Sequence, residues 1–205
     1  IRNLGVFSNF LTAAALTDTE MVNFTNIASD CGVSSNTVKA YFDILCDTYL
    51  GSFLPAFRKR MKRKIIETPK FYFFDVGVVN YLAKRKNLEP GNELFGKAFE
   101  NWIFHELKAY DSYQQRFSNF SYWRLASGTE VDFIVNDMEV AIEAKSRERI
   151  DNVHLKGIRE LKKDHPELKK TYLVCLDNTP RITNDGILIL PVKDFISKLW
   201  SGEIF

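Results

Sequence analysis

Residues 130–146 read EVDFIVNDMEVAIEAKS, and this stretch decides the fold of the C-terminal half. Two apolar runs flank a short polar turn at Asn136 and Asp137, which predicts a β-hairpin. Both runs also carry charges where a core strand would have Val or Ile, namely Asp132, Glu143 and Lys145. Burying such charges is costly, so we expect that something compensates them.

The alternation of side chains along a strand predicts where these charges lie. Asp132 shares a face of the first strand with Ile134, and Glu143 shares a face of the second with Lys145. A two-residue loop pairs Asp132 with Ala141, whereas a four-residue loop pairs it with Glu143. Either loop places Asp132, Glu143 and Lys145 on one face of the sheet, and an odd loop or a bulge would break this arrangement.

Two carboxylates and an ammonium group in an apolar patch predict a Mg²⁺ or Mn²⁺ site. Proteins hold Mg²⁺ through one or two carboxylates, water and substrate phosphate oxygens, so Asp132 and Glu143 are the expected metal ligands. Such an ion stabilises phosphoryl charge and lowers the pKa of a bound water. Lys145 would then orient that water or offset the developing charge. Glu100 lies off the apolar stripe of a helix predicted over 91–110.

The first half of the chain predicts a helix-turn-helix over residues 24–48. Thr25 can cap a first helix, Gly32 suits the tight turn, and Ser34 can cap the second helix. Ala28 supplies a small residue where the two helices would cross.

Two strand-like runs follow, at 49–57 and 69–77, and the basic run RKRMKRK (58–64) lies between them. Strands joined by a basic loop after a helix-turn-helix are typical of a winged helix, which makes DNA the expected partner. The second helix would reach base edges and the loop would contact phosphates. The alternative is a protein-docking module with a solvated loop. The expected DNA contacts are Ser35, Asn36, Lys39, Arg58, Lys59, Arg60, Lys62, Arg63 and Lys64.

Charge divides the chain into two parts. The net charge of +2 arises from +4 over residues 1–90, with 12 Lys/Arg against 8 Asp/Glu, and −2 over 91–205, with 16 against 18. KRKNLEPGN (84–92) reads as the connection, with Pro90 and Gly91 as breakers. We therefore expect a winged helix-turn-helix domain at 1–90 and a second domain at 91–205.

Composition narrows the class of protein. No apolar run approaches the roughly 20 residues of a membrane span, and no signal-peptide pattern opens the chain. Three unpaired cysteines without metal spacing favour the reducing cytoplasm. The chain starts without Met, so we expect a fragment of a longer protein.

The order of motifs resembles the PD-(D/E)xK nuclease superfamily. An acid on a helix, then Asp, then Glu-x-Lys about ten residues later matches its site pattern with Glu100, Asp132, Glu143 and Lys145. Position 132 belongs to a Val-Asp pair and lacks the proline of the eponymous motif. The resemblance implies a mixed α+β and α/β chain, in which a restriction-endonuclease-like αβββαβ core follows the winged helix. Its further elements are expected at 120–125 (strand), 151–164 (helix), 171–176 (strand), 187–190 (strand) and 192–200 (helix).

A closer resemblance covers nearly the whole chain. The helix-turn-helix, PKFYFFDVGVVNYL, FGKAFENWIFHEL, TEVDFIV and AIEAKS are similar to the C-terminal domain of unknown function (family 4143) that follows the ATPase module in prokaryotic AAA-type ATPases. This resemblance implies that an ATPase module precedes Ile1 and carries the ATPase activity.

Two functions are consistent with these residues. The first is a magnesium-dependent DNA nuclease. The second is a catalytically inactive module that binds DNA or protein and regulates the ATPase, in which Glu143 and Lys145 are structural ions that pair with neighbours such as Arg124 or Arg147.

Overall fold

The computed structural model describes residues 3–58 and 67–205 and combines helices with sheets, as the sequence predicts. It separates into two compact units, one from the described residues of 1–54 and 68–88, the other from those of 55–67 and 89–205. No helix in the described part of the chain has the length and apolar character needed to cross a membrane.

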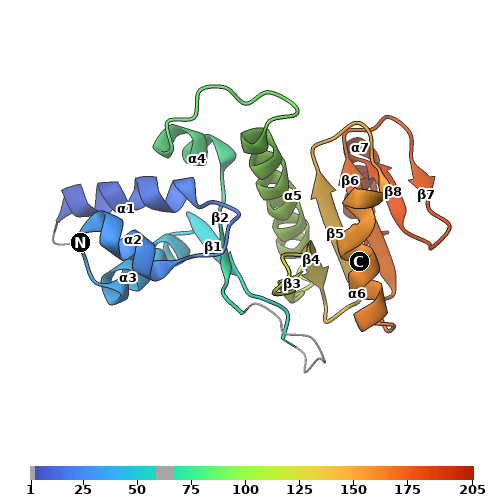
Figure 1. Cartoon of the computed structure of the whole chain (residues 1–205), viewed down its shortest axis with the longest axis horizontal. Coiled ribbons are helices and arrows are strands. Elements are labelled where there is room, and N and C mark those ends of the chain that lie inside the picture. The colour runs from blue at the N-terminus through green and yellow to red at the C-terminus, as the bar shows by residue number, and fades with distance from the viewer. Residues whose placement is uncertain (1–2, 59–66) are drawn as a thin grey trace. The chain divides into compact units, whose positions relative to one another are not determined.

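The first unit consists of four helices and a two-stranded antiparallel sheet in its described residues (Figure 1). Phe42 lies at the centre of its core, with edge-on ring contacts to Phe10 at 5.0 Å and Phe71 at 4.8 Å. Its elements are α1 (Leu4–Leu16), α2 (Phe24–Cys31), α3 (Ser35–Asp47), β1 (Gly51–Leu54), β2 (Lys70–Phe73) and α4 (Val76–Leu82).

Two helices joined by a turn, α2 and α3, form where the sequence predicts them. Gly32 ends α2 with a φ of 65°, a left-handed conformation that favours glycine. The Ser34 hydroxyl accepts a hydrogen bond from the Thr37 amide and caps α3. The prediction for Thr25 is wrong, because Asn23 caps α2 by accepting from the Asn26 amide. Asn23 is the residue just before α2, and from this position a side-chain oxygen reaches the free amides of the first turn. Thr25 lies inside that turn.

The strand predicted over 49–57 divides between the two units. β1 ends at Leu54, and the next residues pair with β3 of the second unit's sheet. The Phe57 amide donates to the Tyr122 carbonyl at 2.7 Å, and the Tyr122 amide donates to Pro55 at 3.0 Å. These bonds cover part of the outer edge of that sheet.

The second unit is built on a six-stranded sheet with the order β3-β4-β5-β6-β8-β7. The first three strands are antiparallel, β5, β6 and β8 are parallel, and the short β7 returns antiparallel. Its elements are α5 (Glu93–Tyr113), β3 (Phe120–Arg124), β4 (Glu130–Val135), β5 (Val140–Lys145), η1 (Asn152–Leu155), α6 (Lys156–Asp164), β6 (Lys170–Cys175), β7 (Arg181–Ile182), β8 (Leu188–Pro191) and α7 (Val192–Trp200).

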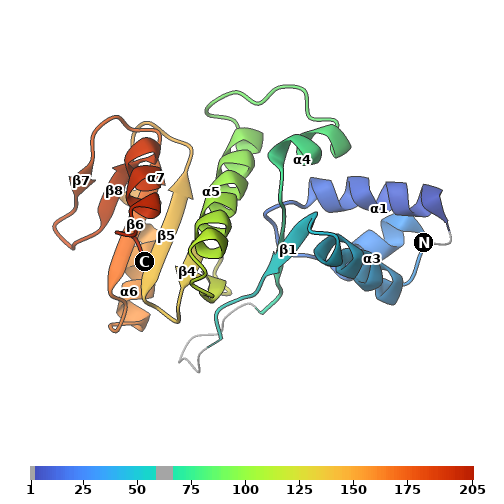
Figure 2. The same cartoon turned by 180° about the vertical axis from the view of Figure 1, so that it is seen from behind.

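Helices cover both faces of this sheet. Ile158 and Leu161 of α6 pack in one core with Ala141 and Leu173 of the sheet. On the opposite face Phe104 of α5 stacks on a strand residue, and α7 contacts β6 and β8. Figures 1 and 2, which view the chain from opposite sides, show α6 in front in one and α7 in front in the other. The sheet is therefore buried on both faces.

Candidate functional site

A four-residue turn sets the register of the β4–β5 hairpin. Val135 pairs with Val140, so residues 136–139 form the loop. Asn136, Asp137 and Met138 all have positive φ values, between 48° and 79°. The Asn136 side chain holds the turn in place, since its oxygen accepts from the Asn119 amide and its nitrogen donates to the Glu139 carboxylate. This register places Asp132 level with Glu143, as expected for the longer of the two loops.

A bulge modifies this arrangement at Asp132. Ser121 of β3 pairs with Ile134 and Trp123 pairs with Val131, so two residues of β4 oppose one residue of β3. The pairing of β4 with β5 runs from Val135 back to Phe133 and does not include Asp132. Asp132 instead accepts a hydrogen bond through Oδ2 from the Ala144 amide, at 2.8 Å. The Asp132 carboxylate thus binds the Ala144 amide at the point where backbone pairing between β4 and β5 ends.

The three charged side chains converge despite the bulge. Lys145 Nζ lies 2.5 Å from Glu143 Oε1 and 3.8 Å from Asp132 Oδ2. Asp132 is 1% exposed and Glu143 is 4% exposed, whereas Lys145 is partly accessible. The expected structural pairing of Glu143 with an arginine does not occur at Arg124, which binds Glu130 at 2.5 Å. One ammonium therefore bridges two buried carboxylates.

Each carboxylate keeps one buried oxygen without a hydrogen-bond partner. These atoms are Asp132 Oδ1 and Glu143 Oε2. An unsatisfied buried carboxylate oxygen costs free energy, so their presence in two neighbouring residues needs an explanation. Hard cations bind carboxylate oxygens, and a divalent ion would satisfy both. No group of three or more His, Cys, Asp or Glu with metal-site geometry occurs among the described residues, so protein donors beyond this pair are not arranged around it.

Burial and repulsion change the proton affinity of this cluster. Burial, followed by the nearby Asp132 carboxylate, raises the pKa of Glu143 to about 8, although Lys145 partly opposes the shift. Burial acts to lower the pKa of Lys145, but Asp132 and Glu143 outweigh it, so the pKa of Lys145 rises and the ammonium stays charged. The Glu100 carboxylate of α5 makes a smaller contribution to this rise.

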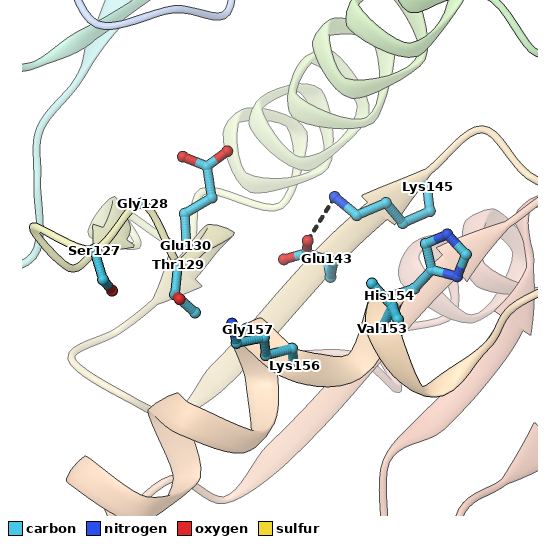
Figure 3. A pocket seen from close by; sticks show the side chains of 10 residues that line it. All are labelled: Ser127, Gly128, Thr129, Glu130, Glu143, Lys145, Val153, His154, Lys156 and Gly157. Atoms are coloured by element: carbon cyan, nitrogen blue, oxygen red, sulfur yellow. Dashed lines mark ion pairs between the residues drawn. The ribbon is translucent and has the colours of Figure 1, made fainter.

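A pocket of about 410 Å³ opens beside the cluster (Figure 3). Glu143 and Lys145 form its wall on β5, and the start of α6 with η1 forms another wall. The turn between β3 and β4 completes it. The sequence did not point to most of its lining, because these residues belong to no motif and meet only in the folded chain. They are Ser127, Gly128, Thr129, Glu130, Val153, His154, Lys156 and Gly157.

The predicted DNA contacts lie in two places. Ser35, Asn36 and Lys39 are in the first turns of α3, where Asn36 and Lys39 are exposed. The Lys39 ammonium also lies 5.6 Å from the centre of the Phe24 ring. Arg58 is exposed at the end of the described segment. The other predicted cations, Lys59, Arg60, Lys62, Arg63 and Lys64, lie outside the described residues.

Two family models match the chain. Residues 95–195 match the family described as Domain of unknown function (DUF4143), and residues 1–89 match the family described as Domain of unknown function (DUF8612). The first match confirms the predicted resemblance to family 4143 over residues 95–195. The resemblance was predicted to extend over nearly the whole chain, but residues 1–89 match a different family. No curated protein and no solved structure matches the chain.

Proposed function

We propose that the second unit is a magnesium-dependent phosphodiesterase that cuts DNA. The observation that carries this proposal is the pair of orphaned oxygens, Asp132 Oδ1 and Glu143 Oε2, each in a buried residue that Lys145 contacts, beside a pocket. A structure gains nothing from leaving two such oxygens unsatisfied, whereas a divalent ion would compensate both.

Asp132 and Glu143 are the residues that would hold Mg²⁺ or Mn²⁺. When bound, the ion would supply a water of lowered pKa and charge stabilisation for the phosphoryl group. Lys145 remains an ammonium beside both carboxylates, so it is a donor that can orient a water or offset charge on the phosphate. Glu100 lies near enough to act on the charge of Lys145, which supports its role as the fourth member.

The proposal extends to the rest of the chain. Three helices followed by an antiparallel strand pair support a winged helix-turn-helix in the first unit, with Ser35, Asn36 and Lys39 facing DNA. The helix, the antiparallel β3–β4–β5 and the parallel β5–β6 pair around α6 support a PD-(D/E)xK-like core. On the family resemblance, we propose that an ATPase module precedes this region in a cytoplasmic protein.

One observation favours a second candidate. The contact between Lys145 and Glu143 at 2.5 Å already occupies one oxygen of Glu143 without a metal. A closed contact of this kind fits an inactive module that binds DNA or protein and regulates the ATPase. The two candidates differ in whether a divalent ion replaces the Lys145 ammonium as the partner of Glu143.

The test is a metal titration run beside a cleavage assay. Calorimetry with Mg²⁺ and Mn²⁺, with and without DNA, measures binding to the purified chain. Supercoiled, linear duplex, single-stranded and branched DNA report cleavage in the same ions. Binding that coincides with cleavage supports the nuclease. A chain that binds neither ion and cuts none of these forms is the inactive module.

A further inference from the structure

The pocket beside Glu143 contains a cation that no acidic side chain neutralises. Four charged residues line it. Glu130 is paired with Arg124 at 2.5 Å, and Glu143 is paired with Lys145 at 2.5 Å. Lys156 has no ion pair or side-chain hydrogen bond in the described part of the chain, and it is exposed. The unbalanced charge of the pocket is therefore the single ammonium of Lys156.

Close packing determines where Lys156 lies. The next residue, Gly157, approaches β4 so closely that a Cβ atom built on it would lie 2.0 Å from the Glu130 carbonyl oxygen. The Arg159 guanidinium then bonds Asn152 at 3.0 Å and Asp185 at 2.8 Å, which ties η1 to α6 and to the β7–β8 turn. The first turn of α6 is thus held against the strand that carries Asp132.

The other side chains around the pocket suit a sugar–phosphate chain. Ser127 and Thr129 contribute hydroxyl groups, and Figure 3 shows them on the opposite side of the pocket from His154. His154 Nδ1 accepts a hydrogen bond from the Asp151 amide at 3.0 Å, so the neutral ring carries its proton on Nε2 and is a donor there. No Phe, Tyr or Trp lines the described pocket, so it offers no platform on which a base would stack.

A second observation, independent of Lys156 at the start of α6, also points to a ligand. Glu143 Oε2 is buried, lacks a protein partner and belongs to a residue that lines the same pocket. An orphaned acceptor oxygen in the residue on one wall and an unpaired ammonium on the other match the two kinds of charge in a metal-bound phosphodiester. The volume of about 410 Å³ falls within the range of small-ligand sites.

We propose that this pocket binds the sugar–phosphate backbone of a nucleic-acid strand, with Lys156 on a phosphate oxygen next to the scissile phosphate. This inference rests on the proposed function, and it adds that the site reads the backbone and ignores the bases. Lys156 is the residue that contributes affinity, and Lys145 remains the residue beside the reacting phosphate.

The proposed contact between Lys156 and a phosphate is tested by removing the two charges separately and together. Abasic oligonucleotides, each with one phosphate replaced by a neutral methylphosphonate, are titrated by fluorescence anisotropy in Ca²⁺. This ion neutralises carboxylates but accepts longer, less regular coordination than Mg²⁺, so binding is measured without turnover. Wild type should lose about tenfold in affinity at one methylphosphonate position. Lys156→Ala should bind the unmodified strand about tenfold more weakly and show no further loss at that position.

Lys169→Ala is the matched control. Lys169 is an exposed lysine just before β6, next to the Met138 end of the hairpin and at the opposite end of β5 from Lys145. The Lys169→Ala variant should keep the wild-type pattern of affinity losses across the methylphosphonate positions. A loss that persists in Lys156→Ala, or equal losses at every position, overturns the backbone subsite. A strand with bases that binds more than tenfold tighter than the abasic strand overturns backbone-only reading. A wild-type methylphosphonate pattern without Mg²⁺-dependent cleavage supports the subsite and rejects only the nuclease.

Discussion

At the scale of single residues, Asp132 has two tasks that one substitution separates. Its Oδ2 accepts the Ala144 amide, and its Oδ1 is free for a cation. Asparagine keeps a carbonyl oxygen for the first task and loses the negative charge that the second requires. We therefore expect Asp132→Asn to abolish Mg²⁺-dependent cleavage and metal binding while the fold remains.

The measurement is calorimetry with Mg²⁺ beside a cleavage assay, and circular dichroism reports the fold. Glu139→Gln is the control, because Glu139 contacts Asn136 at the far end of the same hairpin. Lys145→Ala should differ from Asp132→Asn by keeping metal binding while cleavage slows, since its proposed role is to position water or offset charge. Full activity in Asp132→Asn would contradict the proposed metal site.

The raised pKa of Glu143 makes stability depend on pH. Its pKa is about 8 in the folded chain against an ordinary value of 4.5, so the folded state holds a proton that the unfolded state releases between these values. This contribution to stability is complete below pH 4.5 and is lost as pH rises through 8. Without divalent ions, the free energy of unfolding should fall by a few kcal/mol over this range.

Urea unfolding in EDTA at pH 5, 6.5 and 8 measures this effect. Glu143→Gln mimics the protonated acid and should remove most of the decline, with Glu139→Gln again as the control. If Mg²⁺ binds the unprotonated carboxylate, adding it should restore stability at pH 8 more than at pH 5. A pH dependence that is unchanged in Glu143→Gln would show that another group titrates.

At the scale of elements, the contact between α6 and β4 depends on one glycine. Alanine is normally the better helix former by about 1 kcal/mol. At Gly157 the added Cβ would lie 2.0 Å from the Glu130 carbonyl oxygen, which is backbone and cannot rotate away. Gly157→Ala should therefore destabilise the chain by about 1–3 kcal/mol or more and displace the pocket wall that carries Lys156.

Gly96→Ala in α5 is the matched helix control. There the added Cβ would lie 3.4 Å from the Ser146 hydroxyl, a side chain that can move. Urea midpoints of the two variants should change in opposite directions or by clearly different amounts. Equal small effects would mean that α6 accommodates a side chain by shifting, and that the pocket wall is not held by this contact.

At the scale of the whole molecule, DNA affinity is expected to come from more than one surface. The basic run at 58–64 and the start of α3 are the proposed contacts besides the pocket. Replacing Arg58, Lys59, Arg60, Lys62, Arg63 and Lys64 by Ala should weaken binding to all sequences alike. It should also make the dependence of log affinity on log salt shallower, because fewer counterions are released.

Asn36→Ala provides the contrast for this experiment. It removes a neutral side chain from the start of α3, so it should change discrimination between sequences and leave the salt slope as it is. Binding curves at four salt concentrations, on two DNA sequences, separate the two effects. An unchanged slope in the basic-run variant would show that these cations are solvated and do not contact phosphate.

Much of the fold followed from local patterns. The cap at Ser34 and the left-handed Gly32 act within a few residues of α3, so the sequence predicts α3 and the turn before it. The apolar stripe that predicts α5 is equally local. The alternating strands of the hairpin are local in the same sense. The short β7 and the helices α1 and α4 were not predicted, although Asn3 and Asp75 cap the two helices. The choice of Asn23 over Thr25 as a cap depended on where the helix starts.

The sequence by itself determined which charges belong to the site, because Asp132, Glu143 and Lys145 interrupt apolar strands at positions of fixed side-chain alternation. Only the tertiary structure decided how they meet. The bulge at Asp132 depends on pairing with β3, and the pocket depends on α6 reaching β4 through Gly157. Lys156 and His154 therefore carried no signal in the sequence. Their neighbours include the strand residues Glu130 and Glu143, which are more than ten residues away, and contacts of that kind are set by packing.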